Sequence, residues 1–334
     1  MKKIALTALA LALAASFAPA QSLSDFKSAF ESFAGDMASS LALDASIGSN
    51  WSDAYVGGFP RFGVGFATGA AATGKGSAGP IFAALGQAVP SGLDGIGVPI
   101  PAAALTFKIG LPFLPADIGL TGGYIPPSVG SKLEGLTGVA IDYMNIGAQL
   151  RFALLKENLV LPDLSVGIGA SYQQGGVEAP MGVGAQTLAD QTIAGHAWRV
   201  TASDPRIALG WESTIVDATL QVSKNLLFVR PYLGAGCSFG KSGVTGGVSS
   251  QLGFSRDGSA STSAQLAADL ASAGLEAPEF DAEGYSYSVA ATDPVLRVYG
   301  GVSLSILLLV LDAQAVYVPK TEALGASLTT RIQL

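Results

Sequence analysis

The side chains that usually perform catalysis or hold metals are nearly absent from this sequence. Its 334 residues contain one histidine, His196, and one cysteine, Cys237. One imidazole and one thiol cannot form a histidine-rich or thiolate metal site, and one cysteine cannot form an intramolecular disulfide. A nucleophile–histidine–acid triad would have to use His196, which lies in an expected loop near Trp198. We therefore predict a protein that is not an enzyme, with no catalytic, metal or cofactor site.

A set of polar side chains that alternate with apolar residues is more informative. Its members are Arg61, Lys108, Gln149, Arg151, Asp217, Gln221, Arg230, Tyr232, Arg297, Tyr299, Asp312 and Arg331. A charge on the lipid face of a membrane strand costs about 2–4 kcal/mol at mid-depth, so the alternation predicts that these side chains line the lumen of a barrel. Two interpretations are open: a packed network of paired charges that fills a narrow barrel, or the polar lining of a passage. Glycines of the same parity favour the passage because they leave volume unfilled; they are Gly63, Gly65, Gly119, Gly147, Gly167, Gly169, Gly234 and Gly236.

The composition excludes several classes of protein. Only 13% of the residues are charged, against about 25% in ordinary globular proteins, and 43 are glycines. A hydrophobic content of 49% excludes intrinsic disorder, and a net charge of −7 excludes a nucleic-acid partner because it repels phosphate. Mean hydropathy is +0.45, yet no run of eighteen apolar residues exists beyond the N-terminus, which disfavours a bundle of membrane helices.

The first 20 residues are typical of an export signal. Lys2 and Lys3 precede an apolar stretch at residues 4–15, and Ala18-Pro19-Ala20 supplies the small residues that a signal peptidase accepts. We expect residues 1–20 to be a signal peptide and the mature chain to begin after them.

Residues 21–50 form a region of their own, because apolar residues recur there every three or four positions. Leu23, Phe26, Phe30, Phe33 and Met37 predict an amphipathic helix of roughly four turns, followed by a linker. The helix would either plug a barrel or rest on the periplasmic face of the membrane.

Between residues 51 and 334 the period is two, as in strands with one apolar face. The pattern predicts about ten strands, with a range of eight to fourteen, at residues 59–69, 103–111, 117–124, 144–152, 164–173, 207–222, 227–239, 295–305, 311–317 and 324–334. Strands of about 10 residues can cross hydrocarbon when they are tilted. A soluble sandwich or lipocalin-like barrel also alternates, but its outer face usually carries many Lys and Glu residues, whereas this polar parity is mostly Gly, Ser, Thr and Gln.

Short and long connections alternate, which predicts an all-β, transmembrane, antiparallel up-and-down β-barrel. The long loops, residues 72–101, 175–205 and 241–293, would lie outside the cell. A change of parity near Glu212 predicts a β-bulge, and a turn without Gly or Pro must lie within residues 303–310. Aromatic residues on the apolar parity, near the outer strand ends, fit an interfacial girdle; they are Tyr124, Tyr172, Trp211, Phe239 and Tyr317.

The outer loop at residues 80–105 is unusually apolar. Its apolar side chains include Ile81, Phe82, Leu85, Ile96 and Ile100. A loop in water has no reason to expose them, so we predict that they pack over the barrel mouth or touch the outer leaflet, and that they capture an apolar solute.

The whole pattern resembles the outer-membrane β-barrel proteins of Gram-negative bacteria and spirochaetes. The N-terminal helix and the apolar outer loop are similar in kind to channels of the long-chain fatty-acid transporter type, or to smaller barrels of the OmpW type. Such barrels usually end in an aromatic residue that the barrel-assembly machinery reads, and Leu334 holds that position at the matching parity. The resemblance implies a location in the cell outer membrane, contact with its lipid, and assembly through the C-terminal strand.

Two functions from different classes follow as hypotheses. The first is a channel for passive uptake of small, apolar solutes through the lumen. The second is a non-transporting surface barrel that acts as an adhesin or a structural protein of the outer membrane. The sequence leaves the oligomeric state open.

Overall fold

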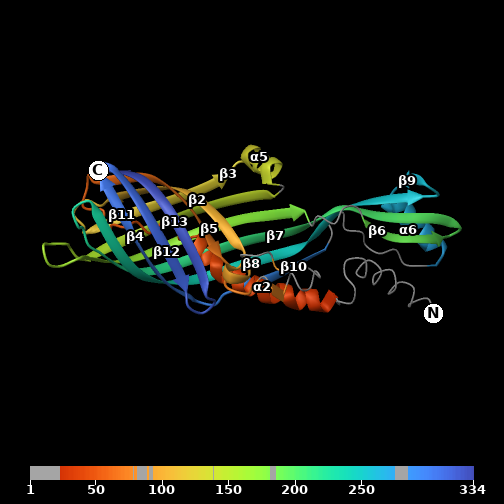
Figure 1. Ribbon diagram of the computed structural model, residues 1–334, viewed down its shortest axis with the longest axis horizontal. Coiled ribbons are helices and arrows are strands. Elements are labelled where there is room, and N and C mark those ends of the chain that lie inside the picture. The colour runs from red at the N-terminus through yellow and green to blue at the C-terminus, as the bar shows by residue number, and fades with distance from the viewer. Residues whose placement is uncertain are drawn as a thin grey trace.

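Ten strands close into an antiparallel barrel in this computed structural model (Figure 1). The structure describes residues 23–77, 79–80, 89, 93–137, 139–180, 186–274 and 285–334. The barrel strands are β1 (Phe62–Ala72), β2 (Pro99–Gly110), β3 (Ala116–Ile125), β4 (Ala140–Leu155), β5 (Asp163–Pro180), β7 (His196–Ser223), β8 (Val229–Arg256), β11 (Val295–Ile306), β12 (Leu309–Val318) and β13 (Ala323–Gln333). Each strand pairs with the next, and β13 returns to β1 with Arg331 opposite Gly65. The predicted fold class is confirmed.

The other described elements lie inside the barrel or beyond one end of it. They are α2 (Leu23–Asp44), α4 (Leu93–Ile96), α5 (Pro127–Thr137), β6 (Gln186–Ile193), β9 (Ser259–Ser261), α6 (Ser263–Ser272) and β10 (Tyr285–Ala291). Among the described helices, none has the length and apolar character needed to cross a membrane.

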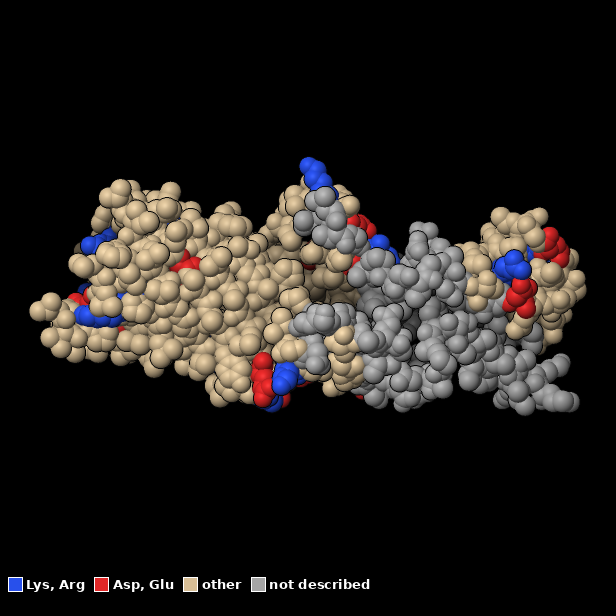
Figure 2. Space-filling model, viewed as in Figure 1, with Lys and Arg blue, Asp and Glu red and all other residues tan. Residues whose placement is uncertain are grey.

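The wall has an apolar outer face and a polar inner face. On β13, Leu328 and Ile332 are 63% and 59% exposed, whereas Arg331 between them in the alternation is 1% exposed. In Figure 2 most of the barrel wall between its two ends carries no visible charge. An exposed apolar belt of this size is costly in water and favourable in hydrocarbon, so it accounts for the period of two in the sequence.

The short turns gather at the end of the barrel where β1 starts and β13 ends (Figure 1). The turn expected within residues 303–310 consists of Leu307 and Leu308, between β11 and β12. Leu307 has φ of +56°, which lets a two-residue connection reverse the chain without glycine. Leu307 is 98% exposed.

The β-bulge predicted near Glu212 is wrong. The pairing of β5 with β7 runs without a shift from Asp163 opposite Ser223 to Pro180 opposite Arg206. Trp211 was expected to face lipid, but it points inward and is 5% exposed, against α2. The apolar helix inside the barrel packs against this part of the wall, so the inward residues here are apolar. In the sequence, the switch of the inward residues from polar to apolar looks like the change of parity that a bulge would cause.

Two of the predicted long loops are largely strand. Residues 175–205 and 241–293 contain the outer parts of β5, β7 and β8. Strands β7 and β8 continue past the barrel and carry β6, β9 and α6, whereas β10 pairs with β8 beside α2 (Figure 1). Residues 72–101 contain the short helix α4 and the first residues of β2, and part of this loop lies outside the described residues.

The extension, defined as residues 186–203 and 251–274, has a small core of its own. Trp198 and Val200 of β7 pack with Leu266 and Leu270 of α6. The indole Nε1 of Trp198 donates to Asp269 at 3.0 Å. These contacts explain why the alternation continues here although the strands have left the barrel.

Candidate functional site

The second half of the helix α2, from Phe33 to Asp44, lies inside the outer half of the barrel, and the start of the helix projects beyond the mouth (Figure 1). Phe33, Met37 and Leu41 are almost completely buried and pack with wall residues that include Tyr143 and Trp211. The helix was expected over residues 23–37 and continues to Asp44. Eight-stranded barrels have room only for side chains, and a barrel of ten strands has room for more, which here is this helix.

Residues 45–56 continue from the helix through the inner half of the lumen, without strand or α-helical structure. Irregular backbone can be buried only when its polar groups are satisfied. The wall provides the partners: Ser52 N donates to Asp312 (2.9 Å), Ala54 N to Ser223 (3.0 Å), Val56 N to Asp117 (3.0 Å), Gln221 Nε2 to Trp51 O (2.7 Å), Arg151 Nη1 to Asp53 O (2.6 Å) and Lys108 Nζ to Ser49 O. We call residues 23–56 the plug segment.

Trp51 is the largest apolar contact between the inner half of the plug segment and the wall. It is 0% exposed, and its Nε1 donates to Thr106 at 2.9 Å. Its ring centroid lies 5.3 Å from Lys108 Nζ and 4.8 Å from Arg331 Cζ, within cation–π range. The ring occupies the space beside Gly63, where an added Cβ would lie 2.7 Å from it.

Arg331 joins the plug segment to two strands. Its guanidinium binds Asp53 of the plug segment at 2.7 Å and Asp312 of β12 at 3.0 Å. Arg230 of β8 also forms an ion pair with Asp53. Because both Arg331 and Asp53 are buried, removal of either one would leave a charge without compensation, which typically costs about 3–5 kcal/mol.

Two further ion pairs hold the wall itself. Arg151 of β4 forms a bidentate pair with Asp117 of β3, at 2.9 and 3.0 Å. Arg297 of β11 binds Asp217 of β7 at 2.7 Å. These pairs cross between strands inside the lumen, so they form a packed network and are not free charges along a passage.

The structure brings most of the predicted lumen residues together. Lys108, Gln149, Arg151, Gln221, Tyr232, Arg297, Tyr299, Asp312 and Arg331 are buried, and Asp217 and Arg230 are half-buried. Arg61 precedes β1 and is exposed at the short-turn end. The inward glycines do not leave the volume unfilled: beside Gly234 stands the Tyr299 ring, and beside Gly236 the Arg297 guanidinium.

Sequence reasoning missed three residues of this network. Asp117 shares its parity with Gly119 and could have been found from that signal. Trp51 and Asp53 precede the first expected strand, at residues 59–69, and their contacts come from strands far away in the sequence. No local pattern could have placed them.

The predicted apolar capture loop is described only in part. Ile81, Phe82 and Leu85 lie outside the described residues. Ile96 ends α4 and is 48% exposed. Ile100 belongs to β2, is 3% exposed and packs on α2, so it is part of the inner wall and not of a loop.

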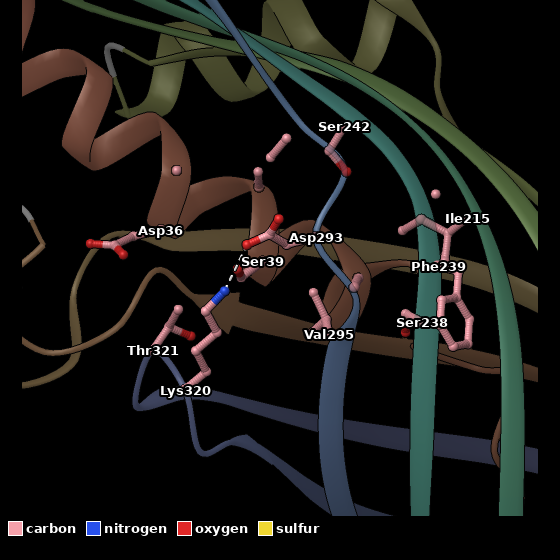
Figure 3. A pocket seen from close by; sticks show the side chains of 15 residues that line it. Asp36, Ser39, Ile215, Ser238, Phe239, Ser242, Asp293, Val295, Lys320 and Thr321 are labelled. Atoms are coloured by element: carbon pink, nitrogen blue, oxygen red, sulfur yellow. Dashed lines mark hydrogen bonds and ion pairs between the residues drawn. The ribbon is translucent and has the colours of Figure 1, made fainter.

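A cavity of about 260 Å³ remains at the outer mouth, between α2 and the wall (Figure 3). Ala38 and Ala42 of the helix face Ile215 and Val295 across it. The ion pair between Lys320 and Asp293, at 2.8 Å, stands at its edge.

Comparison with known proteins gives only coarse likenesses. No protein-family model and no curated protein matches this chain. The translocator domain of the autotransporter NalP from Neisseria meningitidis has a TM-score of 0.40 and 8% identity, over 90% of this chain and 98% of that one. The toluene transporter TbuX of Ralstonia pickettii has a TM-score of 0.21 and 11% identity, over 87% and 90% of the two chains. A mutant of the monoaromatic hydrocarbon channel TodX has a TM-score of 0.22 and 7% identity, over 82% and 89%. The architecture of outer-membrane barrels is established by the closed ring of strands and its apolar exterior.

Proposed function

We propose that this protein is an outer-membrane barrel that is closed by its own plug segment and displays its extension at the cell surface. The observation that carries the proposal is the filled lumen: residues 33–56 occupy it, and buried ion pairs and hydrogen bonds fix them to the wall. A closed barrel of this kind anchors and displays, and it does not conduct.

The orientation follows from the two ends of the barrel. Outer-membrane barrels keep their short turns on the periplasmic side and their longer loops outside. With the short-turn end in the periplasm, the extension and the start of α2 face outward (Figure 1). Trypsin added to intact cells should then cleave the extension, for example after Arg199 or Arg256.

Conductance in planar lipid bilayers tests the closure. The full chain should give no current steps, whereas a variant without residues 23–56 should conduct. A variant without α6 is the matched control, because α6 lies outside the barrel, and it should stay closed. Current steps from the full chain equal to those of the deletion variant would refute the proposal.

Passive uptake of a small apolar solute is the second candidate. The cavity beside α2 favours it, because its walls include Ala38, Ala42, Ile215 and Val295. Uptake requires the plug segment to leave the lumen, so liposomes that contain the full chain would swell in the presence of the solute. Swelling only after deletion of residues 23–56 would exclude uptake by the full chain.

A further inference from the structure

One buried carboxylate in the lumen lacks the cation that the others have. Asp53, Asp117, Asp217 and Asp312 each form an ion pair with an arginine. Asp44, the last residue of α2, is 0% exposed, and neither of its carboxylate oxygens has a hydrogen-bond partner. Among the described lysines and arginines, none forms an ion pair with it. A bare carboxylate in such surroundings is strongly unfavourable, so something must remove its charge.

Lys108 is not the missing partner. Lys108 Nζ is directed to the Ser49 carbonyl and to Gln149 Oε1. Lys108 therefore does not compensate the charge of Asp44.

Two further unpartnered oxygens lie near the end of α2. Gln173 of β5 donates its Nε2 to the carbonyl of Leu41 at 2.8 Å, one helical turn before Asp44, and its Oε1 has no partner. Asn145 of β4 stands opposite Gln173 in the sheet and donates its Nδ2 to the Tyr143 hydroxyl at 3.1 Å. Its Oδ1 is also unpartnered.

Tyr143, whose hydroxyl group accepts the hydrogen bond from Asn145, also lies near the Asp44 carboxylate. The Asp44 charge acts on Tyr143, so the two side chains lie within electrostatic reach of each other. Both amides are almost completely buried, at 2% for Asn145 and 0% for Gln173. Each of them donates one N–H elsewhere and leaves its oxygen atom without a partner.

We infer that Asp44, Asn145 and Gln173 bind a hard cation between α2 and strands β4 and β5. Carboxylate and amide oxygens without nitrogen or sulfur select Na⁺, Mg²⁺ or Ca²⁺ over softer metals. One carboxylate balances one positive charge, which favours Na⁺ in a site this deeply buried. The cation would fasten the plug segment to the wall, which goes beyond closure of the lumen.

Cation-dependent protection of the plug segment tests the inference. The full chain, folded in detergent and dialysed into choline chloride with EDTA, is titrated with NaCl, MgCl₂ or CaCl₂ at constant ionic strength. The readout is the rate at which thermolysin cleaves residues 41–56. A cation that binds only the docked segment lowers the undocked population by a factor of 1 + [L]/Kd, so at ten times Kd the cleavage should be about 11-fold slower.

Three variants make the result specific. Asp44→Asn should abolish the response, and Asn145→Ala should move its midpoint to a higher concentration. Asp293→Asn, an exposed carboxylate at the mouth, should respond like the parent chain. If Asp44→Asn does not fold, the cation response of the parent chain and the shift of its midpoint in Asn145→Ala still test the inference.

Two results would overturn the inference. One is that no cation slows the cleavage of the parent chain. The other is equal slowing in the parent chain and in Asp44→Asn. In either case Asp44 loses its charge by carrying a proton. Neither result depends on whether the barrel conducts, so the proposed function is tested separately.

Discussion

Gly63 offers a direct test of how the plug segment is held, because its missing side chain makes room for Trp51. In Gly63→Ala the new Cβ would lie 2.7 Å from the Trp51 ring and 3.3 Å from the carbonyl oxygen of Ile332. The backbone of β13 is fixed by its pairing with β1, so the indole must move. Overpacking of this kind costs about 1–3 kcal/mol.

That cost falls on the docked state alone, since the ring is free once the plug segment leaves. A factor of ten corresponds to about 1.4 kcal/mol, so the undocked population should rise about 5- to 150-fold. Thermolysin cleavage of residues 41–56 measures this population when redocking is faster than cleavage. We expect cleavage of Gly63→Ala to be faster by that factor.

Two control variants distinguish the clash with Trp51 from a general destabilisation of the barrel wall. Gly122→Ala on β3 adds the same methyl group where no atom lies within 4 Å, so its cleavage rate should not change. In a Trp51→Ala background, Gly63→Ala should have little further effect, because the clash has been removed. Cleavage of Gly63→Ala at the parent rate, or an equal acceleration by Gly122→Ala, would show that Trp51 does not pack as described.

Three further outcomes are expected. Arg331→Met leaves Asp53 and Asp312 buried without this guanidinium, which should lower the stability by about 3–5 kcal/mol. The variant should also produce current steps in lipid bilayers. Native stability together with an absence of current steps would contradict the role of these ion pairs. Trp198→Phe removes the donor to Asp269, so α6 should exchange its amide hydrogens several-fold faster while the barrel amides are unaffected, corresponding to about 1 kcal/mol. In the extension, the hydrogen bond from His196, at 2.6 Å, lowers the pKa of Asp257. The folded-state pKa then lies below the unfolded value of about 3.9, so this contact stabilises the turn above that pH and is lost as the pH falls through the folded-state pKa. Hydrogen exchange at Ala197 should therefore accelerate below about pH 4, and His196→Ala should move that acceleration to higher pH.

The barrel could be predicted because lipid imposes a simple rule on each strand. Residues 324–334 show it, since Leu328 and Ile332 must face hydrocarbon while Arg331 cannot. The rule is local, so it found the ten strands and even the turn at Leu307.

The contents of the barrel follow no such rule. Asp53 is placed by Arg331 and Arg230, which are far away in the sequence, and an irregular segment has no period to reveal its position. The alternation places Trp211 on the wrong face for a related reason. It points inward because it packs on the helix inside the lumen, and alternation along a strand does not reveal an apolar partner inside the barrel. The alternation predicts loops where the extension lies, because the strands of the extension serve a second small core outside the barrel.

The seam between β1 and β13 has a consequence for how the molecule is built. Gly63 and Arg331, which touch Trp51, belong to the first and last strands of the ring. The ring joins its own two ends only when these strands meet, and the indole lies against both of them. The docked plug segment therefore fastens the first strand to the last from inside the lumen, so its docking should stabilise the seam at which the ring closes.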